Sequence, residues 1–309
     1  MAKITFLGTA DSIPSKSRNH LSVLLNYDGE NILFDCGEGT QRQFRKAELN
    51  PCKVTRILIS HWHGDHVLGL PGLLSTLSLS GYTKTLYLYG PRGIKKKFED
   101  MLRVFSFVQN YEIKVEEVGT ARCTPNCGVK GQRFFENEDF YLEAFPLEHG
   151  IPCNGYNFVK KGQRRIDKDK LKKFKIKEGR YLLDLKEGKD LHYENKKYKN
   201  KDLTYLEKDK KVSFVVDTRF NPKISGFVEN ANILIGESTF SRELKKDARE
   251  KMHLTSEDIG NIAKKAGVDK LILAHISSRY LKDIKQILNE VKEIFKNSYL
   301  VKDLDSLEF

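Results

Sequence analysis

Three histidines and one aspartate stand within six residues, at His61, His63, Asp65 and His66. The chain has only 8 histidines in 309 residues, so this density is not background. Imidazole nitrogens and carboxylate oxygens in two adjacent pairs suit two divalent metal ions such as zinc. The segment therefore predicts a metal centre.

This segment follows a strand pattern. The apolar run 57–59 predicts a buried strand, and Gly64 permits a sharp turn after it. Because side chains alternate along a strand, His61 and His63 are expected to point to one side, with the two later ligands in the turn. A solvated, histidine-rich turn without metal is the alternative, and the buried strand before the segment argues against it.

Further ligand candidates occur later in the chain. His149, Asp217 and His275 each follow the end of an apolar run that predicts a strand. Loops at strand ends gather around one site, which is where binding and catalytic residues concentrate. One such residue could be an ordinary polar loop residue, but the repeated pattern favours a shared site.

Strand and helix patterns alternate along the chain, which predicts an α/β fold. Strands are expected at 4–7, 21–25, 31–34, 57–59, 86–89, 140–145, 212–216, 232–235 and 271–273, and helices at 68–79, 256–266 and 281–295. Residues 37–46 are expected to form a loop that feeds a helix, and 123–133 a loop. Thr255 or Ser256 is a natural N-cap for the helix at 256–266.

The net charge of +12 is concentrated in one segment. Residues Lys160 to Lys211 hold 20 Lys and Arg against 10 Asp and Glu, a balance of +10. Such a basic segment suggests a polyanionic partner. It lacks long apolar runs, so it is interpreted as a protruding insert between core parts 1–159 and 212–309, with a helix at 168–174. A solvated surface excursion without a partner is the alternative.

Bulk composition excludes several classes of protein. The length allows one large or two ordinary domains, and a hydrophobic content of 39% supports a sizeable core. No apolar run approaches 18 residues and no signal-peptide pattern opens the chain, so we expect a cytoplasmic protein without a membrane span. The five cysteines are scattered, with Cys123 and Cys127 the only close pair. They predict structural thiols, with a disulfide or a metal clip as the alternative.

Several segments together resemble one family. His-x-His-x-Asp-His after a strand resembles the signature of the metallo-β-lactamase superfamily, and residues 63–74 resemble ribonuclease Z, the tRNA 3′-processing endonuclease family. Segments 6–9, 34–41, 149–153 and 274–280 match the same family in its order. The resemblance implies a four-layer αβ/βα sandwich, two sheets face to face with helices outside.

The resemblance also implies that the basic insert is the tRNA-grasping arm of the family. Many members carry a Gly-Pro-rich stretch in this arm, whereas residues 177–180 contain no proline here. The resemblance further implies a homodimer, with residues 91–94 lying where the dimers of the family touch.

The same resemblance assigns the ligands. One metal ion would take His61, His63 and His149, the other Asp65, His66 and His275, and Asp217 would bridge them. Metal ions roughly 3.5–4 Å apart can hold a hydroxide between them and clamp phosphate oxygens, and zinc lowers the pKa of bound water to about 7. Asp65 would orient that hydroxide and take its proton. Mn²⁺ or another divalent ion could replace zinc.

A general acid is needed because the 3′ oxygen of RNA leaves poorly unless it is protonated. His253 is the predicted acid, with Glu237 holding it, because both lie where the family has its acid pair. A surface histidine and a plain surface carboxylate are the alternatives. Arg279 and Tyr280, beside His275, are predicted to bind substrate phosphate, with a structural role as the alternative.

These features predict a zinc-dependent endoribonuclease that cuts precursor tRNA after the discriminator nucleotide and leaves a tRNA 3′-hydroxyl. A metal-dependent hydrolase of small phosphodiesters or other esters is the first alternative, but a small ester needs no basic arm. A metal-bound, inactive RNA-binding protein is the second, and the complete set of ligand candidates argues against it.

Overall fold

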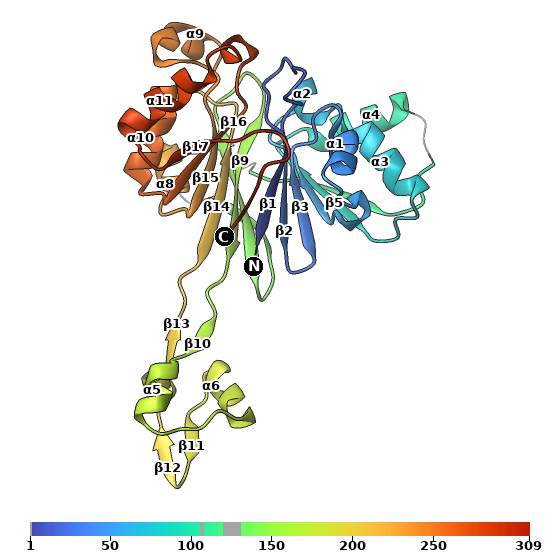
Figure 1. Ribbon diagram of the computed structural model, residues 1–309. Coiled ribbons are helices and arrows are strands. Elements are labelled where there is room, and N and C mark those ends of the chain that lie inside the picture. Colours follow the sequence, from blue (N-terminus) through green and yellow to red (C-terminus); the bar gives the residue numbers. More distant parts are fainter. Residues whose placement is uncertain (1, 106–107, 120–130) are drawn as a thin grey trace. The chain divides into compact units, whose positions relative to one another are not determined.

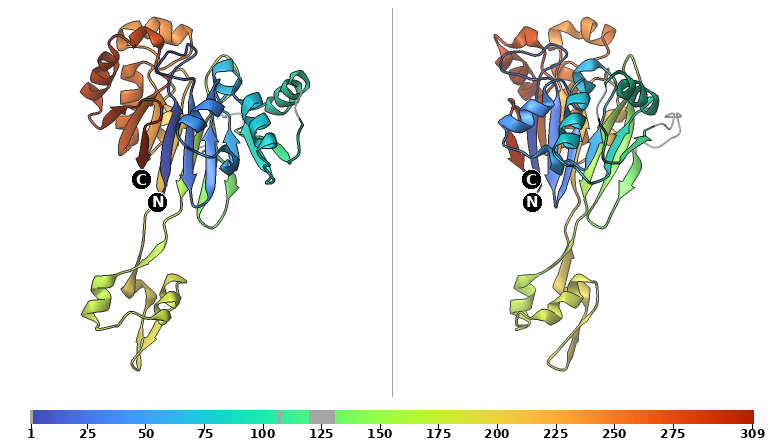
Figure 2. Two further views of the ribbon diagram at one scale, coloured as in Figure 1. Left: turned by 45° about the vertical axis from the view of Figure 1, so that its right-hand side comes forward. Right: turned by 90° about the vertical axis from the view of Figure 1, so that its right-hand side faces the viewer.

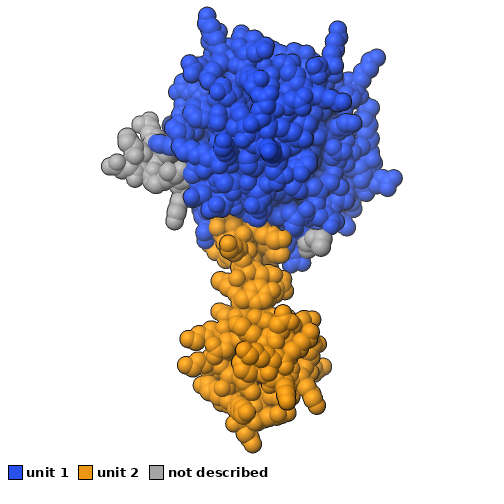
Figure 3. All heavy atoms as spheres, turned by 60° about the vertical axis from the view of Figure 1, so that its left-hand side comes forward, with its two compact units in different colours: residues 1–135, 142–158, 211–309 blue, residues 136–141, 159–210 orange. Residues whose placement is uncertain are grey.

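The computed structural model describes residues 2–105, 108–119 and 131–309. The chain divides into two compact units, which Figure 3 shows in different colours. Unit 1 comprises residues 1–135, 142–158 and 211–309, and unit 2 comprises residues 136–141 and 159–210.

The first sheet of unit 1 has seven strands in the order β18-β1-β2-β3-β4-β5-β6. Its strands are β1 Lys3–Gly8, β2 Ser22–Tyr27, β3 Glu30–Phe34, β4 Arg56–Leu58, β5 Leu86–Gly90, β6 Ile113–Glu117 and β18 Ser306–Glu308. Strands β18 to β3 pair antiparallel, whereas β3 to β6 pair parallel. The parallel half therefore ends at one edge, where loops can bring side chains together.

The second sheet also has seven strands, in the order β17-β16-β15-β14-β9-β8-β7. Its strands are β7 Gln132–Glu136, β8 Phe140–Leu147, β9 Cys153–Lys160, β14 Lys210–Val215, β15 Ile233–Glu237, β16 Lys270–Ala274 and β17 Ser298–Leu300. Strands β14 to β17 pair parallel. Parallel strands packed between other layers are expected to be near-continuously apolar, and β14 to β16 are buried along most of their length.

The two sheets lie face to face, and helices cover their outer faces (Figures 1 and 2). Helices α1 Thr40–Lys46, α3 Leu70–Leu79 and α4 Ile94–Val104 lie on the first sheet, and α8 Lys223–Phe227, α10 Ser256–Ala266 and α11 Ile284–Ile294 on the second. Phe34 of the first sheet packs against Phe214 of the second, with 5.2 Å between the centres of their rings. This arrangement is the four-layer αβ/βα sandwich expected from the sequence.

Helix α10 shows how closely local sequence can set an element. Thr255 accepts a hydrogen bond from the backbone of Asp258, whose side chain accepts from the Thr255 backbone in return. Gly267 ends the helix with a φ of 63°, a conformation that suits glycine. The helix therefore spans the predicted residues 256–266.

Other predicted boundaries differ from the observed ones. Helix α3 begins at Leu70 because Leu68 closes the short helix α2 Gly64–Val67, its N–H donating to the Gly64 carbonyl. Helix α11 begins at Ile284, since a 3-10 turn at Ser278–Tyr280 precedes it. Most of the loop predicted at 123–133 lies outside the described residues, and its last two residues belong to β7.

Unit 2 is small and has its own apolar cluster. Its elements are β10 Arg164–Ile166, α5 Lys168–Lys173, α6 Leu183–Lys186, β11 Leu191–Tyr193, β12 Lys196–Tyr198, α7 Asn200–Leu203 and β13 Thr204–Leu206. Strands β10 and β13 pair, as do β11 and β12. The cluster consists of Leu171, Ile176, Leu182, Leu185, Leu191 and Leu203. Asn200 links these elements, because its side-chain amide donates a hydrogen bond to the Leu185 carbonyl at 2.6 Å. The side-chain oxygen of Asn200 accepts a hydrogen bond from Arg164 at 2.7 Å.

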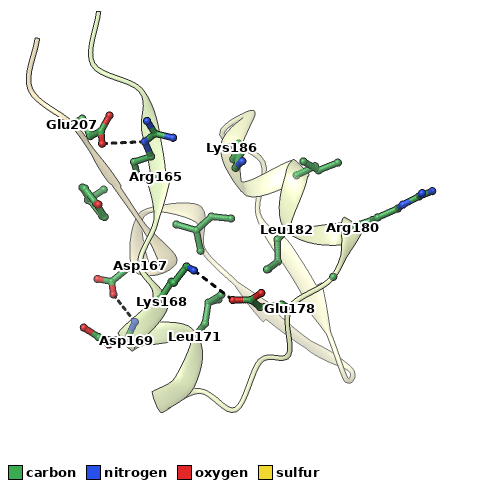
Figure 4. Close-up of a pocket in the computed structure, with 14 residues that line it drawn as sticks. Arg165, Asp167, Lys168, Asp169, Leu171, Glu178, Arg180, Leu182, Lys186 and Glu207 are labelled. Carbon is green, nitrogen blue, oxygen red and sulfur yellow. Dashed lines mark hydrogen bonds and ion pairs between the residues drawn. The ribbon is translucent and has the colours of Figure 1, made fainter. Parts of the chain in front are cut away.

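Unit 2 also contains a cavity of about 940 Å³ (Figure 4). Its wall carries both signs of charge, including the ion pairs Arg165–Glu207 at 3.0 Å and Lys168–Glu178 at 3.8 Å. The described residues thus pair part of the positive charge of unit 2 internally.

Two sequence predictions concern compartments. Across residues 2–105, 108–119 and 131–309, no helix has both the length and the apolar character that a membrane crossing demands. Cys36, Cys52 and Cys153 are free thiols. Cys123 and Cys127 lie outside the described residues.

Candidate metal centre

The predicted ligands meet at the carboxyl ends of parallel strands in both sheets. His61 follows β4 in the first sheet, while Asp217 follows β14 and His275 follows β16 in the second. Because strands that run parallel end at the same edge, and the two sheets face one another, these side chains converge. Ligand sites are expected at this edge of such sheets.

One set of ligand atoms consists of His61, His63, His149 and Asp217. His63 Nδ1 lies 2.9 Å from His61 Nε2 and 3.3 Å from His149 Nε2. Asp217 Oδ2 lies 3.4 Å from His61 Nε2 and 4.0 Å from His149 Nε2. Ligands about 2.1 Å from a tetrahedral ion are roughly 3.4 Å from one another, so these separations fit one metal ion.

A second set consists of Asp65, His66, His275 and again Asp217. His66 Nε2 lies 3.1 Å from Asp65 Oδ2 and 3.4 Å from Asp217 Oδ2. His275 Nε2 lies 3.1 Å from Asp217 Oδ1 and 3.6 Å from Asp65 Oδ2. Asp217 thus offers one oxygen to both sets and its other oxygen to His275. Asp65 and His66 come from the first turn of α2 and not from the open turn that the sequence suggested.

Three atoms of the second set lack hydrogen-bond partners. His66 Nε2, His275 Nε2 and Asp217 Oδ1 are buried, and no described residue forms a hydrogen bond with them. Buried polar atoms are almost always paired in native proteins, because leaving one unpaired costs free energy. A divalent cation would satisfy all three, so the residues present fit a divalent metal centre.

The protonation of the first set suits metal binding. Burial lowers the pKa of His61 well below its usual value, and the nearby His66 lowers it further. Burial also lowers the pKa of His63, with His149 adding to the effect. Neutral imidazole is the form that binds a metal ion, so both residues are prepared as ligands.

The second set carries paired charges. Burial opposes ionisation of Asp217, but His275 and His66 outweigh it and hold its pKa well below the usual range. For Asp65 burial likewise raises the pKa, and the neighbouring His275 and His66 lower it by more. Burial opposes a charge on His66, yet Asp35 and Asp217 raise its pKa. These carboxylates stabilise protons on the neighbouring histidines. A bound metal cation would neutralise the same negative charge in place of those protons.

Three residues of the centre have left-handed backbone. The φ angles are 55° at Asp35, 49° at Asp217 and 53° at His275. Residues other than glycine rarely adopt this region, although Asp and His do so more readily than most. Each of these residues lies within two positions of the end of a parallel strand. Such strained positions persist where the surrounding structure holds them, and they cluster at functional sites.

Asp35 is a supporting residue that the sequence analysis did not single out. It is fully buried, accepts hydrogen bonds from the Ser60 backbone at 2.7 Å and the Ser60 hydroxyl at 2.8 Å, and lies 2.7 Å from His66 Nδ1. The same hydroxyl lies 3.0 Å from His61 Nδ1. These contacts hold the Nδ1 sides of both rings, which leaves Nε2 for metal. The available signal was its place directly after a predicted strand, the signal that singled out Asp217.

The predicted acid pair lies beside the ligands. His253 Nδ1 is 2.9 Å from Glu237 Oε2, and the His253 ring is 5.4 Å from that of His149 and 5.9 Å from that of His275. Burial lowers the pKa of His253, but the Glu237 carboxylate outweighs this and raises it to about 9. The Glu237 carboxylate therefore favours the positively charged form of the His253 imidazole.

Glu237 is itself fixed by neighbours. It is fully buried at the end of β15, and it accepts hydrogen bonds from the Thr218 backbone at 2.8 Å and the Thr239 hydroxyl at 2.5 Å. Thr239 Oγ1 also lies 3.1 Å from His275 Nδ1. One hydroxyl thus links the acid pair to a ligand of the second set, so both keep a common orientation.

The two residues predicted to bind substrate phosphate have different surroundings. Tyr280 is buried in the core of unit 1, and its hydroxyl accepts a hydrogen bond from the Ser241 backbone at 2.9 Å. These contacts support the structural alternative for Tyr280. Arg279 is exposed and stands 4.7 Å above the ring of Phe240. A phosphate contact by either residue stays a prediction.

Known proteins resemble this chain along nearly its whole length. It is 38% identical over 300 residues to "Ribonuclease Z" of Methanococcus aeolicus, a match that covers 96% of this chain and 91% of that protein. The chain belongs to the ribonuclease Z family. The family predicted from the sequence is therefore confirmed.

Solved structures agree with this assignment. The human tRNase Z, short form, superposes with a TM-score of 0.71 at 26% identity and covers 99% of this chain and 98% of its own. The metallo-β-lactamase fold protein YhfI of Bacillus subtilis has a TM-score of 0.69 at 17% identity, covers 100% of this chain and 99% of its own, and supports the fold alone. The predicted fold class is confirmed.

One family model matches only the first half of this ribonuclease Z family member. The model described as "Anti-Pycsar protein Apyc1" matches residues 2–158, which places that half in its family as well. The matched half includes the ligands from His61 to His149. Asp217, His253 and His275 lie beyond it, whereas the ribonuclease Z match spans nearly the whole chain.

Proposed function

We propose that this ribonuclease Z family member removes 3′ trailers from precursor tRNA, cutting after the discriminator nucleotide and leaving a 3′-hydroxyl on the tRNA. Membership of the family over nearly the whole chain supports the substrate. The observation that carries the chemistry is the convergence of two ligand sets on Asp217, with the His253–Glu237 pair beside them.

Two divalent ions, zinc foremost, would occupy the two ligand sets. His61, His63 and His149 would hold one, Asp65, His66 and His275 the other, and Asp217 would bridge them. When bound, such ions make water acidic near neutral pH and neutralise the charge of phosphate oxygens. Mn²⁺ could serve in place of zinc, because nitrogen and oxygen ligands accept several metals.

Residues of the chain would handle the protons. Asp65 Oδ2 faces His66 and His275, so its other oxygen would accept a proton from the attacking water. His253 Nδ1 is held by Glu237, so Nε2 would carry the second proton. As the bond between phosphorus and O3′ breaks, His253 would donate that proton to O3′ and make it a better leaving group. Glu237 positions His253 and favours its charged form.

The basic residues of unit 2 would bind phosphates of the tRNA other than the one that is cut. The balance of +10 between Lys160 and Lys211 supports this role, because each neutralised phosphate releases counterions and strengthens binding. The same segment argues against a hydrolase of small phosphodiesters, which would not use it. The homodimer and the cytoplasmic location expected from the sequence stay predictions.

A cleavage assay tests this proposal. Purified protein is incubated with zinc and a 3′-extended precursor tRNA, and the cut is mapped at nucleotide resolution. A single cut after the discriminator, with a 3′-hydroxyl on the tRNA, is expected. Efficient hydrolysis of a small nitrophenyl phosphodiester without any cut in the precursor would instead identify a small-substrate hydrolase.

A further inference from the structure

A second cavity lies in unit 1 beside the predicted acid. It has a volume of about 630 Å³, and His253 is part of its wall. Glu148, the residue before the ligand His149, is also part of the wall. The cavity therefore adjoins the ligand sets, and its size is within the range of small-molecule sites.

The wall of this cavity includes the exposed aromatic ring of Phe220, which lies on a loop held by hydrogen bonds and an ion pair. Phe220 lies three residues after Asp217 and is 48% exposed. Its neighbours in the chain are both held by Glu148, whose carboxylate accepts from Arg219 Nη2 and from the Asn221 amide, each at 2.5 Å. An exposed ring whose loop is already fixed loses little freedom when a planar group stacks on it.

Helix α9, Lys245–Glu250, adds a positive charge to the wall of the cavity. Arg249 lines the cavity and is exposed, and no acidic side chain among the described residues pairs with it. The other cations of the wall are engaged, since Arg219 pairs with Glu148 at 2.5 Å and Lys245 with Glu257 at 3.0 Å. Arg249 is thus the wall cation available to an anionic ligand.

We propose that this cavity binds the nucleoside that carries the departing O3′, with its base stacked on Phe220 and its 5′ phosphate near Arg249. The inference rests on the proposed function, because the role of His253 fixes which nucleotide is involved. If His253 protonates O3′, the sugar bearing O3′ must lie against its ring. The nucleoside then extends away from the metal ligands into the cavity whose wall includes that ring. Its identity is the last nucleotide of the tRNA before the cut.

The test combines a Phe220→Ala variant with two precursor tRNAs, one intact and one abasic at the last nucleotide before the cut. On the intact substrate the variant should lose roughly 5- to 150-fold in kcat/KM, the fold-change that corresponds to about 1–3 kcal/mol of stacking. On the abasic substrate it should match the wild-type protein, because no base remains to stack. Phe105→Ala is the matched control, since that ring is 45% exposed and lies outside the cavity wall.

Arg249→Gln should behave differently. It should lower kcat/KM on both substrates alike and make binding less dependent on salt, because the phosphate is present in both. Lys246→Gln on the same helix is the control, as Lys246 does not line the cavity. If Arg249→Gln and Lys246→Gln have the same kcat/KM and the same salt dependence, Arg249 does not contact the phosphate.

Three outcomes for Phe220→Ala would overturn the assignment of the cavity. They are no loss on either substrate, an equal loss on both, and, when a third precursor that is abasic at the first trailer nucleotide is added, a loss that disappears only on that third substrate. The last would place the trailer in the cavity. If the wild-type protein cuts neither precursor, the proposed function fails and the cavity assignment fails with it.

Discussion

The metal centre of unit 1 and the basic surface of unit 2 use charge in opposite ways. In the centre, His61, His66 and His275 are at most 1% exposed, and their nitrogens lie 3.1–3.4 Å from oxygens of Asp217. In unit 2 the lysines of α5 lie on the surface, and ion pairs such as Lys170–Asp167 at 3.7 Å engage only part of them.

This difference decides how each region tolerates change. Charges buried at low dielectric interact strongly, so the removal of one atom leaves its partners uncompensated. Exposed charges are screened by water and salt, so each contributes little and only their sum matters. One substitution should therefore destroy the function of the centre, whereas unit 2 should respond to the number of charges removed.

Asp217→Ala is expected to have the largest effect. Both ligand sets lose a shared carboxylate, so bound metal and cleavage should be lost together. Metal content per chain and cleavage of precursor tRNA are measured on the same preparation. Asp100→Ala is the control, because that carboxylate is 49% exposed and forms only surface ion pairs. An Asp217→Ala protein that keeps its metal and its activity would rule out a shared ligand.

His253→Ala should act on the reaction and leave the metal in place. Cleavage of precursor tRNA should slow by roughly 10²–10⁴-fold, the usual contribution of a positioned general acid. The loss should be much smaller on a nitrophenyl phosphodiester, whose leaving group needs no proton. Because Asp217, Glu237, His253 and His275 could also hold an ion, loss of metal in this variant would make His253 a ligand and the acid assignment wrong.

Replacement of residues 161–209 with a short Gly/Ser linker tests unit 2 as a whole. Strands β9 and β14 are neighbours in one sheet, so the linker can join them without breaking the sheet. Hydrolysis of a small phosphodiester should be unchanged, while precursor tRNA should bind more weakly, on the order of 100-fold, with a shallower salt dependence.

A milder variant separates charge from fold in unit 2. Lys172, Lys173 and Lys175 changed together to Gln should give an intermediate loss of affinity, since the apolar cluster of unit 2 stays complete. Unchanged tRNA affinity and salt slope in the folded linker variant would show that the basic segment is a surface excursion without a partner.

Asp35→Asn should weaken the metal centre without abolishing it, because Asp35 supports the ligand His66 and belongs to neither ligand set. Asparagine keeps the shape and can still accept from the Ser60 backbone, but it loses the negative charge 2.7 Å from His66 Nδ1. Loss of such a supporting contact typically costs 10- to 100-fold in metal affinity. Competition with a chelator measures this affinity, and Asp28→Asn in an exposed turn is the control. An effect as large as that of Asp217→Ala would make Asp35 a ligand itself.

Sequence reasoning succeeded where the signal is local. Helix α10 was predictable to the residue because its cap and its terminal glycine act within one turn of the helix. The left-handed backbone of Asp35, Asp217 and His275 shows the opposite case. No neighbour in sequence demands it, and contacts with distant residues accompany it, such as the hydrogen bond that the Asp35 backbone donates to the Leu58 carbonyl.

The cavity beside His253 was also beyond the sequence. Phe220 and Arg249 belong to no recognisable sequence motif. The loop after β14 and helix α9 bring them to the wall of one cavity. Their importance follows from which side chains pair with which, and pairing between distant residues is decided by the fold. The ion pair between Arg219 and Glu148, 71 positions apart, is an example.

Residue types and their spacing determined the family, the fold class and the residues able to bind metal, because ligand chemistry needs particular atoms and strand periodicity is a local property. The tertiary structure decided that Asp217 serves both ligand sets, that Asp35 and Ser60 orient the imidazoles, and that Glu237 meets His253. The position of Asp217 joins residues from both sheets, and the other two relations join segments of one sheet that are distant in the sequence. They exist only when the carboxyl ends of the parallel strands meet at a common edge, a condition of packing that no local run of sequence expresses.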